Sequence, residues 1–219
     1  MPSRRLLAAT LLSAALASHG AGAQALAPPT AKQVHAFFRA VQTDDAATVR
    51  KLVGAVVNAN ELSPLGGEPA LVLAIREGAR EVVRELLRHP GTDLERQALN
   101  GNTALMMAAF KRDEEAVRAL LARGARVNQP GWSALHYAAA SGDDKIAQLL
   151  IEHGAEIDAL SPRASGAYTP LMLAAREGQD ATARLLVARG ASTALKNAEG
   201  LTAARIAQRA GRDRLAGEL

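Results

Sequence analysis

Residues 131–139 read Gly-Trp-Ser-Ala-Leu-His-Tyr-Ala-Ala, and this order sets the pattern for most of the chain. A glycine comes before a hydroxyl residue, an apolar position follows, and a pair of alanines closes the stretch. Similar stretches occur at 67–75, 101–109 and 168–175. Because self-similarity at a regular interval is typical of repeat architectures, these stretches decide the fold class before any other feature.

The apolar residue that leads each copy marks the spacing of the units. Read along the chain, these positions are Phe37, Leu71, Leu105, Leu135, Leu171 and Ala204. The successive intervals between them are 34, 34, 30, 36 and 33 residues. A period near 33 with this motif resembles the ankyrin repeat, over about 36–219. The resemblance implies an all-α solenoid of stacked helix-turn-helix units with short β-hairpin-like fingers.

The residues of one unit explain its two expected helices. Thr169 supplies a hydroxyl that caps free N–H groups, and Pro170 suits the first helical turn. Gly178 is expected to end this helix in a left-handed turn, which other residues adopt only with strain. A second helix follows, with Leu185 and Leu186 on its buried face. Each unit therefore contributes one thin layer, which suits an aromatic content of only 3%.

The chain divides into three expected parts. Residues 1–23 are a signal peptide, 24–35 a linker and the start of an N-terminal cap, and 36–219 the ankyrin repeat domain. We expect a degenerate first unit, because terminal repeats have one face in water. The approximate bounds of the units are 36–66, 67–99, 100–129, 130–163, 166–198 and 199–219.

The first 23 residues have the order of a secretory signal: a basic head with Arg4 and Arg5, an apolar run, and small residues ending at Ala23. The apolar run is too short for a transmembrane helix, which needs about 20 residues. We therefore expect cleavage near Ala23 and a periplasmic or secreted mature protein without a membrane span. Residues 3–7, Ser-Arg-Arg-Leu-Leu, also resemble a twin-arginine signal, so the export route stays open.

Composition excludes several kinds of site. The chain has no cysteine, so it has no disulfide, no thiol nucleophile, no thiolate metal ligand and no lipoprotein attachment point. Removing Arg4 and Arg5 from the formal net charge of +4 leaves +2. Acidic and basic residues are interleaved, and no Lys/Arg cluster alternates with aromatic residues. We therefore expect no nucleic-acid partner.

The histidines do not form a recognisable catalytic or metal-binding set. His136 has the position at which the resemblance implies a hydrogen bond to a hydroxyl residue, here Ser133, whereas Met106 and Met172 replace it in the neighbouring units. No H-E-x-x-H, G-x-S-x-G or phosphate-binding glycine loop is present. Trp132 and the two tyrosines are too scattered to bind a planar cofactor. We therefore expect no enzyme activity, no cofactor and no metal. The alternative is a metal protein or enzyme that uses His136 or His153 with nearby carboxylates.

Two departures from the regular repeat affect the surface. The distance from a layer-ending glycine to the next leading residue is 14 from Gly91 to Leu105, but 11 across the finger at 128–131 and 17 across 161–166. A shortened finger beside an extended one predicts a notch and a knob on one edge. Arg112 replaces the usual helix-ending glycine, which should cost about 1 kcal/mol if the left-handed geometry is kept.

The candidate binding residues follow from the resemblance, which implies that partners dock on finger tips and on the exposed ends of first helices. Carried over by alignment, the candidates are Trp132, Tyr168, Phe110, Lys111, Arg176, Glu177, Arg76 and Asn102. Ala140 and Ser141 hold the corresponding first-helix positions of the fourth unit. Trp, Tyr and Arg dominate interface hot spots, and Trp132 is the single tryptophan. The alternative is that Trp132 and Tyr168 only shield the turn before the helix.

The expected function is an exported, monomeric protein–protein interaction module. It would dock a partner protein of unknown identity on its concave face and stabilise, inhibit or localise that partner. The alternative function is that of a secreted effector acting inside a host cell.

Overall fold

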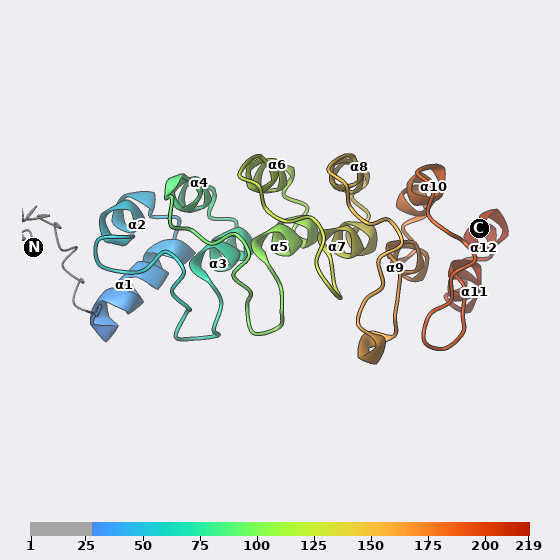
Figure 1. Ribbon diagram of the computed structural model, residues 1–219, viewed down its shortest axis with the longest axis horizontal. Coiled ribbons are helices and arrows are strands. Elements are labelled where there is room, and N and C mark those ends of the chain that lie inside the picture. The colour runs from blue at the N-terminus through green and yellow to red at the C-terminus, as the bar shows by residue number, and fades with distance from the viewer. Residues whose placement is uncertain (1–27) are drawn as a thin grey trace, which may run out of the picture.

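The computed structural model describes residues 28–219. The expected signal peptide at 1–23 and its cleavage position at Ala23 lie outside these residues. Within 28–219 the helices form two parallel rows, and loops project from one edge as fingers (Figure 1). The same residues contain no β-strand, only isolated β-bridges between Val53 and Val57 and between Leu62 and Pro69. The prediction of an all-α solenoid is confirmed.

The inner row contains the first helix of each unit. Its members are α1 (Ala31–Gln42), α3 (Ala70–Glu77), α5 (Ala104–Phe110), α7 (Ala134–Ser141), α9 (Pro170–Glu177) and α11 (Ala203–Arg209). The outer row contains the second helices. Its members are α2 (Ala46–Leu52), α4 (Arg80–Arg88), α6 (Glu114–Ala122), α8 (Asp144–Glu152), α10 (Asp180–Ala188) and α12 (Asp213–Glu218). We call the surface formed by the inner row and the fingers the inner face.

Side-chain caps fix where the helices begin. Thr103 and Thr169 accept the backbone N–H of Met106 at 3.4 Å and of Met172 at 3.2 Å. In the outer row, the Asp143 carboxylate accepts the N–H of Ile146 at 3.0 Å. These bonds satisfy N–H groups that have no partner inside the helix. Helix starts are therefore set by local sequence.

The first helices end in left-handed residues, as the glycine pattern predicts. Gly142 and Gly178 have φ of 71° and 73° at the C-caps of α7 and α9. Arg112 follows α5 with φ of 57°, so the left-handed geometry is kept without glycine. Its guanidinium lies 3.4 Å from the carboxylate of Asp143 in the next unit.

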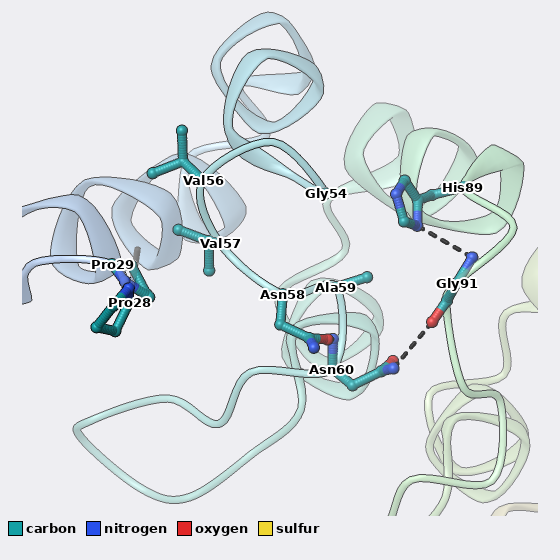
Figure 2. A pocket seen from close by; sticks show the side chains of 10 residues that line it. All are labelled: Pro28, Pro29, Gly54, Val56, Val57, Asn58, Ala59, Asn60, His89 and Gly91. Carbon is teal, nitrogen blue, oxygen red and sulfur yellow. Dashed lines mark hydrogen bonds between the residues drawn. The ribbon is translucent and has the colours of Figure 1, made fainter. Parts of the chain in front are cut away.

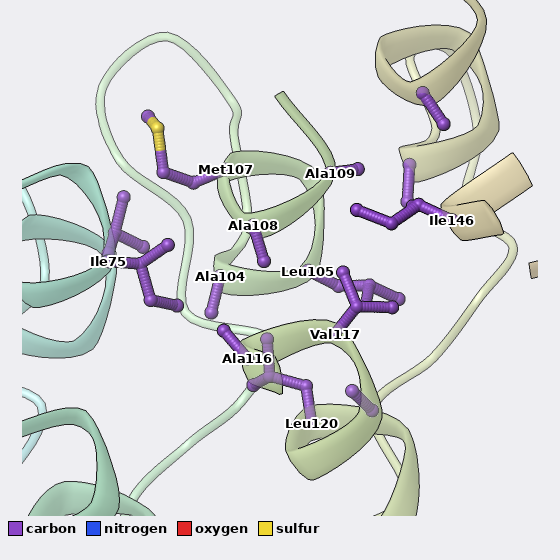
Figure 3. Packing of buried hydrophobic residues seen from close by; sticks show 14 of the residues in the cluster. Ile75, Ala104, Leu105, Met107, Ala108, Ala109, Ala116, Val117, Leu120 and Ile146 are labelled. Atoms are coloured by element: carbon purple, nitrogen blue, oxygen red, sulfur yellow. The ribbon is translucent and has the colours of Figure 1, made fainter. Parts of the chain in front are cut away.

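The core is one continuous layer between the two rows. Leu105, Leu135 and Leu171 are at most 2% exposed, and the paired alanines beside them are completely buried. Figure 3 shows α5 facing Val117 and Leu120 of the outer row across this layer. Alanines let neighbouring inner helices approach closely, and apolar burial of about 25 cal/mol per Å² stabilises the stack. Few aromatic residues are needed because the layer is thin.

Asparagines connect successive units along the base of the fingers. The side chain of Asn60 donates to the Gly91 carbonyl at 2.9 Å and accepts the N–H of Asp93 at 2.7 Å. Asn128 repeats this arrangement with Gly154 at 2.7 Å and Glu156 at 2.9 Å. Each asparagine therefore holds the chain of the following unit in register.

Arginine–carboxylate pairs connect the outer row. Arg84 lies 2.9 Å from Glu115, and Arg184 lies 2.6 Å from Glu218. The hydrogen bond from Arg84 lowers the pKa of Glu115 below its ordinary value. These pairs are solvent-exposed, so each contributes little to stability.

The unequal fingers are present as predicted. The finger at 128–131 is short, whereas the following one carries the 3₁₀ helix η1 (Arg163–Ser165) (Figure 1). The extension closes through Ser161, whose N–H donates to the Tyr168 carbonyl at 2.9 Å. A Cβ atom on Gly131 would lie 3.2 Å from Pro162, so the two fingers contact each other at their base.

Candidate protein-binding surface

Three aromatic rings gather on the inner face between the third and fourth units. Phe110 at the end of α5 packs edge-on against Tyr137 of α7, with ring centroids 6.0 Å apart. Trp132, which precedes α7, lies 6.2 Å from the same tyrosine ring. The Tyr137 hydroxyl donates to the Asn102 side-chain oxygen at 2.6 Å, which fixes the ring. Phe110 is 55% exposed, so this cluster is open to solvent.

Tyr137 is a member that the sequence candidates did not include. The expectation that Trp132 and the two tyrosines are too scattered to bind a planar cofactor stays a prediction, although Trp132 and Tyr137 share one surface. The sequence contained a signal for Tyr137, because residues three and four apart on a helix share a face. Tyr137 therefore lies on the face of Ala140 and Ser141, which were candidate first-helix positions.

Tyr168 and Arg176 continue this surface into the fifth unit. The Arg176 guanidinium carbon lies 4.9 Å from the centroid of the Tyr168 ring. Its Nε also donates to the Glu177 carboxylate at 2.8 Å. Stacking and ion pairing together hold the guanidinium beside the aromatic cluster.

A hollow of about 350 Å³ lies between these groups. Its lining comes from α5, α7, α9 and the segment that precedes α7: Phe110, Trp132, His136, Tyr137, Ala140, Ser141, Leu173, Arg176 and Glu177. The hollow brings together four of the eight sequence candidates, Phe110, Trp132, Arg176 and Glu177. We call it the α7 hollow.

The other four candidates lie around or away from the α7 hollow. Lys111 is exposed next to Phe110 and lines a separate hollow beside α3 and α4. Asn102 positions Tyr137, and Tyr168 supports Arg176. Arg76 stays separate on α3, where it pairs with Glu68 at 3.0 Å and Glu77 at 2.9 Å.

His136 forms the hydrogen-bond network implied by the resemblance. Its Nδ1 lies 2.8 Å from the Ser133 hydroxyl, and its Nε2 lies 3.0 Å from the Tyr168 carbonyl. A carbonyl only accepts, so Nε2 carries the proton and Nδ1 accepts from Ser133. Burial lowers the pKa of His136, which favours this neutral form. The imidazole therefore links the fourth unit to the extended finger of the fifth.

The neighbouring units replace this network with sulfur. The backbone N–H of Thr103 donates to the Met106 sulfur at 3.5 Å, and that of Thr169 to Met172 at 3.4 Å. Thioether sulfur is a weak acceptor. The Met106 sulfur also accepts from the Gln129 side chain of the following finger at 3.3 Å. Among these three units, an imidazole makes the contact to the next finger in the fourth unit alone.

The alternative metal or catalytic use of His136 or His153 gains no support from the geometry. His136 is fully buried and Ser133 is 3% exposed. His153 ends α8, and its Nδ1 lies 2.8 Å from the Leu149 carbonyl. In the described part of the chain, no three His, Asp or Glu side chains gather around a possible metal position. Nor does any helix there have the length and apolar character needed to cross a membrane.

A second hollow of about 350 Å³ lies at the N-terminal end of the stack (Figure 2). Pro28 and Pro29 form one side of it, and His89 and Gly91 form the other. The Gly91 N–H donates to His89 Nδ1 at 3.2 Å, and its carbonyl accepts from Asn60 at 2.9 Å. These polar groups already form hydrogen bonds with one another. Because the bond between Asn60 and Gly91 joins neighbouring units, we assign the hollow to the packing between units.

Exposed leucines on the fingers were not among the sequence candidates. Leu65 is 85% exposed, Leu99 is 83% exposed and Leu160 is 49% exposed. A leucine in a turn gives no periodic signal that separates an exposed position from a buried one. They add apolar area to the finger edge, away from the α7 hollow.

Comparison with known proteins identifies the repeat. The family described as ankyrin repeats (3 copies) matches residues 37–130, 90–161 and 126–197. The human transient receptor potential cation channel subfamily A member 1 is 31% identical over 102 residues, 45% of this chain and 9% of that protein. Human neurogenic locus notch homolog protein 1 is 37% identical over 128 residues, 57% of this chain and 5% of that protein. The chain thus spans less than a tenth of these relatives.

A solved structure matches a larger share of this chain than these relatives do. The crystal structure of the ankyrin repeat domain of Bcl-3, described as a unique member of the IkappaB protein family, superposes with a TM-score of 0.70. It is 32% identical, and the match covers 83% of this chain and 79% of that chain.

Proposed function

This chain belongs to the ankyrin repeat family, whose repeats are protein–protein interaction modules, and we propose that it is an exported module that docks a partner protein on its inner face. The partner would be stabilised, inhibited or localised by a monomeric scaffold. No step of chemistry is required of the chain itself.

The observation that carries this proposal is the exposed aromatic surface around the α7 hollow. Trp132, Tyr137 and Arg176 are residue types that dominate interface hot spots. Tyr137 and Arg176 project from inner helices whose buried faces are tightly packed, and Trp132 lies just before α7, so their positions are fixed before binding. A preorganised surface loses little conformational entropy on association, which favours affinity.

Export is supported by the order of residues in 1–23. A basic head, an apolar run and small residues before Gln24 are typical of a cleaved signal. The test is fractionation followed by mass measurement of the intact protein. A periplasmic species that begins at Gln24 is the expected result. Recovery of the protein in host-cell cytosol would instead favour the effector alternative.

Partner docking is tested with variants of the inner face. The mature chain would be used to capture proteins from a periplasmic extract of the source cells, with identification by mass spectrometry. Replacing Trp132 and Tyr168 by alanine together should reduce capture of the identified partner at least about tenfold, since hot-spot truncations commonly cost more than 1 kcal/mol. Arg118→Ala on the outer helix α6 is the control and should capture normally. Unchanged capture by the double variant would refute the docking surface.

A further inference from the structure

We propose that His136 is a pH-sensitive connection: when acid protonates its imidazole, the segment that begins α7 moves away from the extended finger, while the two helical rows stay folded. Trp132 lies in this segment, so the inner face would change with pH. The inference needs no partner, and only its consequence for docking rests on the proposed function.

Both nitrogens of the His136 ring have partners that fit the neutral form alone. Nε2 donates to the Tyr168 carbonyl at 3.0 Å, and Nδ1 accepts the backbone N–H of Ser133 at 3.2 Å. A second proton has to go on Nδ1, where it would face that N–H. The Ser133 hydroxyl, 2.8 Å from Nδ1, can turn to accept the new proton, but the backbone N–H cannot. Protonation therefore leaves a buried donor without its partner, which is costly.

The surroundings of His136 do not stabilise a charged ring. The side chain is 0% exposed, so water does not reach it. Burial lowers the pKa of His136, and the carbonyls of Tyr168 and Ala159 oppose this to a smaller extent. Within 28–219 no carboxylate bonds to the ring. A proton taken up by His136 is therefore accommodated by moving the ring towards water.

Neighbouring charges do not replace water as a source of stabilisation. α5 has no ionisable residue between Ala104 and Phe110. On α9, the Arg176 guanidinium and the Glu177 carboxylate line the α7 hollow with His136 but pair with each other at 2.8 Å. The other ionisable side chains on α7, on the elements packed against it and on the extended finger are Tyr137, Asp144, Lys145, Glu152, Glu156, Asp158, Arg163 and Tyr168.

Several members of the candidate surface depend on this imidazole. The Trp132 ring lies edge-on to it, with ring centroids 5.4 Å apart. The Tyr168 carbonyl accepts from it, and the ring of the same tyrosine lies 4.9 Å from the Arg176 guanidinium carbon. Movement of His136 would therefore displace Trp132 and release the support of Arg176.

The pH sensitivity should be confined to the fourth unit. Met106 and Met172 hold the equivalent positions in the neighbouring units, and a thioether does not titrate. The histidines at 35 and 153 each lie 2.8 Å through Nδ1 from a carbonyl of their own helix. Such a contact persists when the ring is protonated, because Nδ1 then remains a donor.

The test is a pH titration of the mature chain from about 8 to 4.5, in which the emission of Trp132 and the helical circular dichroism signal are followed together. Trp132 is the single tryptophan, so its emission reports on this segment alone. The emission should change with a midpoint below about pH 6.5, the ordinary value for histidine, while the helical signal is unchanged. Loss of the helical signal at the same pH as the emission change would overturn the proposal, because the whole stack would then be unfolding.

His136→Gln is the variant that isolates the proton. Its amide oxygen accepts from the Ser133 N–H and its amide nitrogen donates to the Tyr168 carbonyl, but the group does not titrate. The emission change should be lost in this variant and kept in His153→Gln, the matched control. The same emission change in folded His136→Gln would refute the role of His136.

Proton NMR of the wild-type chain keeps the test decisive if His136→Gln does not fold. The ring signals of His136 and the indole signal of Trp132 should shift with one common midpoint. Separate midpoints would show that protonation of His136 does not move Trp132.

The two proposals fail in different ways. If Trp132 emission responds to pH as expected but the Trp132 and Tyr168 double variant captures the partner normally, the docking surface is wrong and the connection at His136 stands. If capture is lost in the double variant but emission does not respond to pH, the docking surface stands and this inference is wrong.

Discussion

The fourth unit and its two neighbours share a buried leucine and a buried alanine pair, but they differ elsewhere. Leu105, Leu135 and Leu171 occupy equivalent buried positions beside buried alanine pairs. At the surface, however, the fourth unit has a short finger and a small residue at Ala140, and in its interior it has His136 where the neighbours have methionine. This difference shows that the buried positions and the exposed positions of one repeat are under separate structural requirements. Stacking fixes the apolar positions, which leaves the inner face free to vary from unit to unit.

The largest expected effect comes from the shared interior. Replacing Leu105, Leu135 or Leu171 by alanine should each lower the free energy of unfolding by about 2–5 kcal/mol, because each leaves a cavity between the rows. Urea titrations followed by circular dichroism measure the loss. The three losses should be similar, and a loss confined to one unit would show that the interiors are not equivalent.

A smaller effect should distinguish the fourth unit. His136→Met copies the neighbouring units. It removes one of the two donors to the Tyr168 carbonyl and leaves the buried Ser133 hydroxyl without its imidazole acceptor, so it should cost about 1–3 kcal/mol. Met172→Leu in the fifth unit is the matched control, and it should cost less than about 1.5 kcal/mol because volume is conserved. A larger loss for the control than for His136→Met would remove the distinction between histidine and sulfur.

The same variant should change how stability depends on pH. Burial lowers the pKa of folded His136, so the unfolded chain takes up a proton more readily. The unfolding free energy should therefore fall as the pH drops below about 6.5, the ordinary value for histidine. Urea titrations above and below that pH would show a weaker decrease for His136→Met than for wild type. An identical decrease would mean that His136 is not the group responsible.

The smallest effect concerns the ends of the inner helices. Gly142→Ala should destabilise the fold by about 1–2 kcal/mol, because alanine is strained at positive φ and its Cβ would meet Gln179. Arg112→Gly should have the opposite sign and stabilise by up to about 1 kcal/mol. The melting temperatures of both variants measure these two changes in stability. A stabilising Gly142→Ala would contradict the left-handed geometry.

Sequence patterns within a single repeat were sufficient to predict much of the fold. The hydroxyl caps, the left-handed turn at Gly178 and the unequal fingers were all predicted, because each depends on residues close together in the chain. Contacts between units were not predicted. Asn60 reaches Gly91 and Tyr137 reaches Asn102 across more than thirty residues, and no local pattern marks these partners.

The candidate site was predicted less completely, because it also depends on contacts between residues of different units. Trp132 and Arg176 were visible by alignment to the repeat. The α7 hollow was not, since it arises from a small residue between two large ones on adjacent helices. Tyr137 was overlooked although its helical spacing to Ala140 was available.

The contact between the short and the extended finger has a consequence for how a partner can be seated. A surface with the same features in every unit would let an extended partner bind in several equivalent positions, each shifted by one repeat. The recess at Gly131 and the projection at η1 break that translational symmetry at one place. A partner that touches both can bind in one alignment only.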